Sequence, residues 1–85
     1  MTEYLKMPRL SRSAAEGTLT VCHRREGDYV FEREALFQVQ AAGISGEVLA
    51  PWDGILRKVY YEEDMSVPVG EIMAEIEREP LLSRR

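Results

Sequence analysis

The sequence predicts an all-β domain, a flattened barrel or sandwich of two four-stranded antiparallel sheets related by a quasi-twofold axis. Two observations predict it: short alternating apolar runs separated by turn residues, and an internal repeat. The chain has 85 residues and is 45% hydrophobic, which suffices for one small core. We therefore expect one domain over residues 1–79, followed by a mobile tail or linker stump over residues 80–85.

Eight short strands are expected, each bounded by glycine, proline or charged turn residues. No window holds a helical stripe of useful length. The six longer candidates are Tyr4–Met7, Gly17–His23, Ala35–Gln40, Gly46–Leu49, Gly54–Tyr60 and Ile72–Ile76, and the two short ones are Tyr29–Val30 and Val67–Pro68.

A shift of 37 positions aligns the chain with itself, and the matches fall at strand starts and at core-type positions. Two half-units that cannot each cover an apolar face would stack those faces together. The identical pairs are Gly17 with Gly54, Leu19 with Leu56, Glu26 with Glu63, Val30 with Val67 and Glu34 with Glu71; the conservative pairs are Cys22 with Val59, Leu36 with Met73 and Val39 with Ile76.

The two halves are joined by a small, uncharged stretch from Gln40 to Gly46, which is typical of a hairpin tip. Gly43 can take a positive φ there at little cost. Under the symmetry, the counterpart of this tip is the pair of chain termini. We therefore expect the tip to stand alone at one end of the molecule.

Composition excludes several classes of function. The net charge of −4 comes from 15 acidic and 11 basic residues spread along the chain, so no basic stripe is available for nucleic acid. No apolar run approaches the length of a membrane span, and the N-terminus lacks the layout of a secretory signal. We expect a cytoplasmic monomer that binds neither nucleic acid nor membranes. Cys22 is the one cysteine, and a small apolar core position is predicted for it.

No catalytic or metal-binding constellation can be assembled from the spacing of polar residues. His23 is the single histidine, and a solvated strand-end position is favoured over a catalytic or metal role. The turns Arg24–Glu26 and Glu62–Asp64 are interpreted as solvated loops, because three adjacent acids do not match a calcium loop. We therefore predict that the chain is not an enzyme.

Three aromatic residues leave a choice open. Trp52, in a turn, is either a contact residue for a partner or a cover over an open end of the core. Tyr60 and Tyr61 would place one ring on each face of a strand, so one is expected in the core and the other in solvent.

Taken together, several motifs resemble the biotinyl/lipoyl attachment family, and most closely the lipoyl domains of 2-oxo acid dehydrogenase acyltransferases. The resemblance covers residues 3 to 77 and implies the fold known as a barrel-sandwich hybrid. The motifs are Lys6-Met7-Pro8-Arg9-Leu10-Ser11, Glu16-Gly17-Thr18-Leu19, Glu26-Gly27-Asp28-Tyr29-Val30, Ala50-Pro51, Gly54-Ile55-Leu56 and Val67-Pro68-Val69-Gly70.

The resemblance also implies where a cofactor would attach. Members of the family present a lysine at the tip of the hairpin between the two halves, and its ε-amine forms an amide with lipoate or biotin. Counting back from Ala50-Pro51 without a gap puts Gly43 at that position. Lipoyl domains have an acid before the lysine, where this chain has Ala42, whereas Gln40-Ala41 is closer to biotinyl motifs, so the nearer subfamily stays open.

Three functions remain in competition. The first is a binding or structural module without cofactor, associated with a biotin- or lipoate-dependent enzyme system, whose docking candidates are Ala41, Ala42, Gly43, Ile44, Ser45 and Trp52. The second is an arm-less subunit or excised domain of a 2-oxo acid dehydrogenase or carboxylase complex. The third is a cofactor-free hairpin domain like those of membrane-fusion proteins, which ranks last because the tip carries no long helical insertion.

Overall fold

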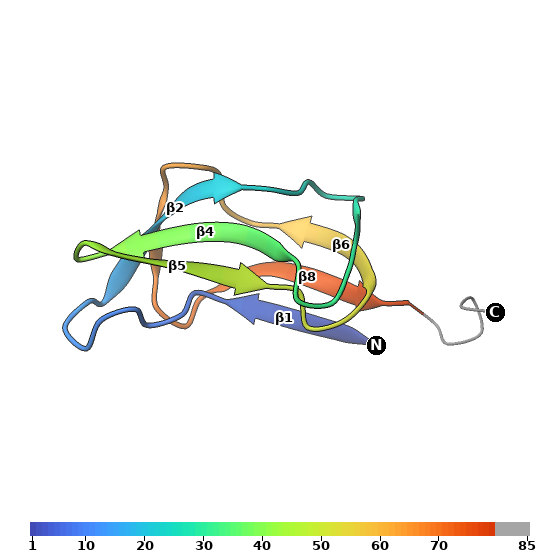
Figure 1. The fold of residues 1–85 in the computed structure, drawn as a ribbon, viewed down its shortest axis with the longest axis horizontal. Coiled ribbons are helices and arrows are strands. Elements are labelled where there is room, and N and C mark those ends of the chain that lie inside the picture. Colours follow the sequence, from blue (N-terminus) through green and yellow to red (C-terminus); the bar gives the residue numbers. More distant parts are fainter. Residues whose placement is uncertain (80–85) are drawn as a thin grey trace.

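Two four-stranded antiparallel sheets form a flattened sandwich in the computed structural model, which describes residues 1–79 (Figure 1). The predicted tail, residues 80–85, lies outside the described residues. One sheet has the strand order β1-β8-β6-β3 and the other β5-β4-β2-β7. Among the described residues there is no helix that could cross a membrane. The all-β prediction with two four-stranded sheets is confirmed.

All eight predicted strands are present, with ends that differ from the predicted ones by a few residues. Their bounds are β1 Thr2–Lys6, β2 Glu16–Cys22, β3 Tyr29–Val30, β4 Ala35–Ala41, β5 Ile44–Leu49, β6 Gly54–Val59, β7 Ser66–Pro68 and β8 Ile72–Arg78.

The stretch expected as a loop between β4 and β5 is shorter than predicted. β4 continues to Ala41 and β5 begins at Ile44, so the loop is only Ala42 and Gly43. Cross-strand pairs hold the flanking residues in the ladder, including Gln40 with Ser45. The prediction of a seven-residue linker was wrong, because small uncharged residues can pair across an antiparallel ladder as readily as they form a loop.

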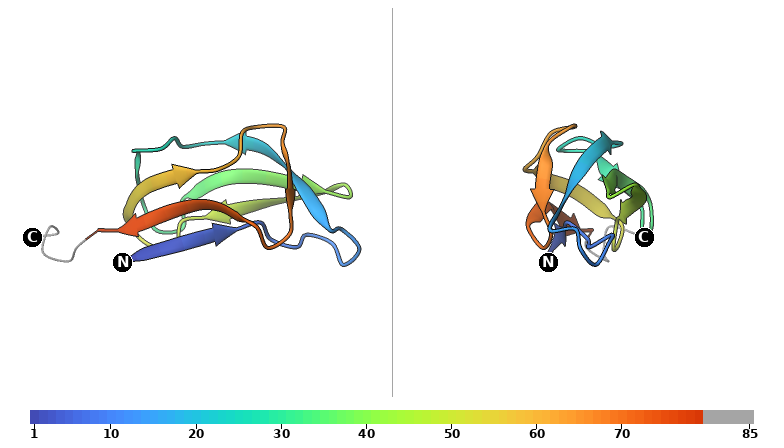
Figure 2. Two further views of the ribbon diagram at one scale, coloured as in Figure 1. Left: turned by 180° about the vertical axis from the view of Figure 1, so that it is seen from behind. Right: turned by 90° about the vertical axis from the view of Figure 1, so that its left-hand side faces the viewer.

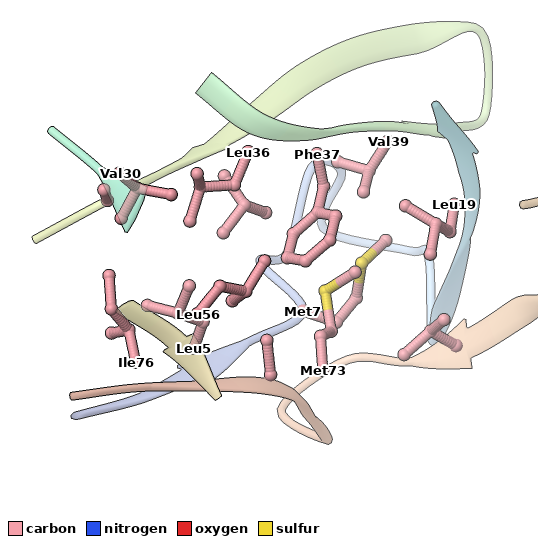
Figure 3. Close-up of a cluster of buried hydrophobic side chains, with 14 residues drawn as sticks. Leu5, Met7, Leu19, Val30, Leu36, Phe37, Val39, Leu56, Met73 and Ile76 are labelled. Atoms are coloured by element: carbon pink, nitrogen blue, oxygen red, sulfur yellow. The ribbon is translucent and has the colours of Figure 1, made fainter. Parts of the chain in front are cut away.

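The core lies between the two sheets, where inward side chains of both meet (Figure 3). The repeat predicted it well, because four of the pairs that match at a shift of 37 positions are almost completely buried. These pairs are Leu19 with Leu56, Val30 with Val67, Leu36 with Met73 and Val39 with Ile76.

The internal repeat also extends to the backbone hydrogen bonds. The amide of Leu19 donates to the carbonyl of Met65 at 3.0 Å, and the amide of Leu56, 37 positions on, donates to the carbonyl of Asp28 at 2.9 Å. The return bonds match as well: the Asp64 amide reaches the Leu19 carbonyl at 2.6 Å, and the Gly27 amide reaches the Leu56 carbonyl at 2.7 Å. The two halves therefore share one local geometry where they cross.

The tip of the β4–β5 hairpin and the N-terminus lie at opposite ends of the molecule. The view from behind in Figure 2 shows β1 starting, and β8 finishing, at the end away from the hairpin. The prediction that the tip stands alone at its end is wrong, because the loop between β1 and β2 reaches the same end of the molecule (Figure 1). Leu10 of that loop lies against β5, 2.6 Å from a Cβ built on Gly46. The tip is therefore far from the N-terminus but shares its end of the molecule with the β1–β2 loop.

Candidate functional site

The candidate site is the tip of the β4–β5 hairpin, where the family resemblance places a cofactor attachment point. Ala42 and Gly43 both have positive φ, 52° and 77°, which matches the twist of a two-residue hairpin turn. A Cβ built on Gly43 would meet nothing within 4 Å. The tip is therefore open to solvent at position 43, but the residue there has no side chain to modify.

A shallow hollow of about 380 Å³ adjoins the tip on the outer face of the sheet β5-β4-β2-β7. Its polar lining is mostly uncharged, from Thr18, Thr20, Gln40 and Ser66, with the single carboxylate Glu16. The Ser66 hydroxyl donates to Glu16 Oε1 at 2.8 Å, which ties β7 to β2 beside the hollow. The surface beside the tip can therefore accept a neutral polar segment.

The two lysines of the chain lie away from this site. Lys6 is on β1 opposite Ile72, and Lys58 is on β6 opposite Glu75. Both strands belong to the sheet β1-β8-β6-β3, whereas the hairpin belongs to the other sheet. Within residues 1–79, the residues at the tip thus do not fit an amide-linked cofactor, because the amine it requires is on other strands.

Trp52 does not join the tip, although it was among the docking candidates. It follows β5, which runs from the tip toward the opposite end of the molecule (Figure 1). Its ring packs partly buried against the core, and the guanidinium carbon of Arg78 lies 5.0 Å from the ring centroid. The indole therefore covers one end of the core. Its Nε1 is buried without a hydrogen-bond partner in the described structure.

The other residues weighed in the sequence, His23 and Cys22, lie at positions that suggest no catalytic or metal-binding role. His23 is exposed at the end of β2, and its backbone amide donates to the Leu36 carbonyl. Cys22 packs against the margin of the core, partly buried, rather than inside it as expected. Burial, with the nearby charge of Glu63, raises the pKa of the Cys22 thiol. Across residues 1–79, no group of three or more metal-ligating side chains is placed to hold a metal ion.

Two glutamates expected to be merely solvated have a structural role. Glu26 Oε2 accepts the backbone amide of Val59 at 2.8 Å, and Glu63 Oε2 accepts that of Cys22 at 2.9 Å. Each carboxylate thus satisfies an amide in the opposite half of the molecule, beside the irregularity in β6 or β2. The one signal in the sequence was that Glu26 and Glu63 match at a shift of 37 positions.

Comparison with known proteins shows the family. The sequence model of the biotin/lipoyl family, described as biotin-requiring enzyme, matches residues 3–76. The chain belongs to the biotin/lipoyl family. The family match spans both halves of the repeat and the hairpin between them, and it leaves out only the first residue of β1 and the last two of β8 among the strand residues.

Individual relatives are components of acyltransferase systems. The chain is 33% identical over 72 residues to the dihydrolipoyllysine-residue succinyltransferase component of the 2-oxoglutarate dehydrogenase complex of Bacillus subtilis, covering 85% of this chain and 17% of the relative. It is 33% identical over 70 residues to the dihydrolipoyllysine-residue acetyltransferase component of the acetoin cleaving system of Pseudomonas putida. That match covers 82% of this chain and 19% of the relative. The chain thus spans less than a fifth of the length of these relatives.

A solved structure shares the fold. The lipoyl domain of the 2-oxoglutarate dehydrogenase complex from Azotobacter vinelandii superposes with a TM-score of 0.75 at 23% identity, covering 89% of this chain and 99% of that one. The architecture of this biotin/lipoyl domain is therefore that of a lipoyl domain.

Proposed function

We propose that this chain is a biotin/lipoyl-family domain that carries no cofactor and acts as a binding or structural module rather than as an enzyme. One observation carries the proposal: the hairpin tip is intact, yet Gly43 occupies it and the lysines are on the other sheet. An amide link to lipoate or biotin requires a primary amine, and the tip offers none.

The first test is the intact mass of the full chain after co-expression with active lipoate and biotin ligases. The expected result is the unmodified mass. A lipoyl or biotinyl adduct, at Lys6, Lys58 or elsewhere, would overturn the proposal.

A gain-of-function pair sharpens this test. Gly43→Lys should create an acceptor, since a side chain at position 43 points into open space. Gly70→Lys is a matched control, because Gly70 also has a positive φ, 89°, and no atom within 4 Å of a built Cβ. Modification of the first variant alone supports the assignment of position 43, whereas a folded Gly43→Lys that no ligase modifies would contradict it.

The association we propose is with a biotin- or lipoate-dependent enzyme system, through the exposed tip residues 42–45 and the neutral hollow beside them. Ala41, also named as a docking candidate, was wrong in this respect, because it is the last residue of β4 and its side chain is buried. Isotope-labelled protein titrated with purified 2-oxo acid dehydrogenase or biotin carboxylase components of the source organism should shift tip resonances. Shifts confined to the far end, near Trp52, would refute docking through the tip.

A second candidate is favoured by the length comparison. Because the chain spans under a fifth of the acyltransferase components it resembles, it also fits an arm-less subunit or an excised domain of such a complex. Co-purification of the tagged chain with acyltransferase components at fixed stoichiometry would favour this candidate. Isolation as a free monomer would favour the stand-alone module.

A further inference from the structure

A second surface, separate from the tip, combines aromatic rings with carboxylates. It consists of two hollows of about 440 and 600 Å³ that adjoin at Tyr61, and we name it the tyrosine groove. The first hollow is lined by Tyr60, Tyr61, Glu71, Ile72 and Glu75. The second lies between the two symmetry-related turns after β2 and β6, over Cys22 and Val59. Neither shares a residue with the hollow beside the tip.

Charge is unevenly distributed along the tyrosine groove. Six carboxylates line it against two guanidinium groups, Arg24 and Arg25. Arg24 is already paired with Glu34, which does not line the groove. The carboxylates are those of Glu26, Glu62, Glu63, Asp64, Glu71 and Glu75. The groove is therefore more acidic than the chain as a whole, and it repels phosphate groups and anionic membranes.

Exposed apolar surface accompanies this charge. Tyr60 is 51% exposed and Ile72 is 38% exposed, although burial of such large apolar side chains usually stabilises a protein. The Tyr60 hydroxyl donates to Glu75 Oε2, which fixes the ring beside a carboxylate and raises the pKa of Tyr60. A ring face next to a carboxylate is the arrangement that recognises a guanidinium or ammonium group, by cation–π contact and ion pairing together.

We propose that the tyrosine groove binds a cationic segment of a partner protein, in which arginine or lysine alternates with apolar residues. The apolar side chains of the segment cover Ile72 and Tyr60, and its cations meet the carboxylates at the rim. The match of charge selects this occupant, since a neutral or acidic segment would leave the rim carboxylates uncompensated.

The test is a nuclear magnetic resonance titration of the full isotope-labelled chain with a short, end-capped synthetic peptide of alternating arginine and leucine. Saturable shifts are expected at residues of the tyrosine groove, and they should weaken as salt is added. A peptide of alternating glutamate and leucine should leave the spectrum unchanged. Absence of saturable shifts with the arginine peptide, or shifts spread over the whole surface, would overturn the proposal.

A pair of triple variants separates the groove from general attraction to an acidic chain. The groove variant Glu62→Gln, Asp64→Asn, Glu71→Gln and the control Glu3→Gln, Glu32→Gln, Glu47→Gln each remove three exposed negative charges. Within residues 1–79, none of these six carboxylates makes a hydrogen bond or ion pair. The groove variant should bind the arginine peptide about tenfold more weakly. Equal weakening in the control would contradict a specific site.

The aromatic contribution has its own control. Tyr60→Leu should weaken binding of the arginine peptide by about threefold, because it removes the ring face but keeps an apolar side chain. Phe31→Leu replaces an aromatic residue that is 60% exposed and does not line the groove, so it should leave the affinity unchanged. If the two variants behave alike, the ring of Tyr60 is not part of the binding surface.

Discussion

The internal repeat allows one substitution to be compared at two symmetry-related positions. Gly17 is the second residue of β2, and Gly54 is the first residue of the equivalent strand β6. Gly17 pairs with Val67 and Gly54 pairs with Val30, so the two pairings are also related by the repeat. A Cβ at Gly54 would lie 2.0 Å from the Glu77 carbonyl oxygen and 3.2 Å from the Arg78 Cα, both in the backbone of β8. A Cβ at Gly17 would lie 2.1 Å from the terminal methyl of Met7 and 3.2 Å from the Gln40 carbonyl oxygen.

The two clashes should lower the free energy of unfolding by different amounts, because paired backbone moves less easily than the end of a side chain. β8 is held between β1 and β6, so Gly54→Ala must displace paired backbone, and we expect a loss of about 3 kcal/mol. At Gly17 the closest atom is the flexible end of the buried Met7 side chain, which can change rotamer, and the Gln40 carbonyl needs to move only slightly. The alanine also restricts the unfolded chain, so a loss of about 1 kcal/mol is expected. For 85 residues, total stability is of order 4 to 13 kcal/mol, so both variants should be measurable.

The assay is urea unfolding of both variants and the parent, followed by circular dichroism. This probe is preferred to tryptophan fluorescence because Arg78, which is displaced at Gly54, also contacts Trp52. The midpoints should fall in the order parent, Gly17→Ala, Gly54→Ala with a constant slope. If Gly17→Ala costs as much as Gly54→Ala, the distinction between backbone and side-chain clashes is wrong for this fold.

Three further outcomes are expected. The Glu34 carboxylate accepts the backbone amide of Phe31 and pairs with Arg24, and these contacts hold the pKa of Glu34 below its ordinary value of 4.5. The stabilisation from the ionised carboxylate is therefore present above pH 4.5 and is lost as the pH falls through the lowered pKa. In Glu34→Gln the free energy of unfolding, measured by urea unfolding at several pH values, should depend less steeply on pH in that range. Because the pKa of Cys22 is raised, its thiol should react with iodoacetamide at pH 8 more slowly than free cysteine, and Glu63→Gln should speed the reaction. Leu56→Ala should lower the urea midpoint by an amount equivalent to about 3 kcal/mol, since Leu56 is fully buried.

The strands and core were predictable because they depend on local alternation and on the repeat. Leu36 and Met73, for example, match at a shift of 37 positions, and both prove to be buried. Each half must supply the same apolar face, so the repeat identifies inward positions without knowledge of strand pairing. The two-residue turn at Ala42 and Gly43 was not predictable, because the register of β4 on β5 decides where the ladder ends.

The candidate site was predicted in part for a similar reason. The family resemblance placed Gly43 at a hairpin tip. Trp52 was added to the docking candidates because tryptophan is frequent at interfaces, but β5 separates it from the tip, and the alternative that it covers one end of the core is the one the structure supports. The roles of Glu26 and Glu63 were missed because each carboxylate bonds an amide from the other half of the chain. Such contacts depend on tertiary proximity, which the composition of a turn does not reveal.

The turns of the two halves show that a left-handed turn position in this fold accepts either glycine or a residue with a side chain. At one pair of equivalent positions Gly27 and Asp64 have φ of 94° and 73°, and at another Arg33 and Gly70 have 70° and 89°. In each pair a glycine and a residue with a side chain adopt the same left-handed backbone, which costs the latter about 1 kcal/mol. Position 43 is under the same rule, so a lysine there would cost the scaffold little beyond this strain. The fold is thus compatible with either residue at position 43, and in our proposal Gly43 determines whether the domain can carry a cofactor without determining whether it folds.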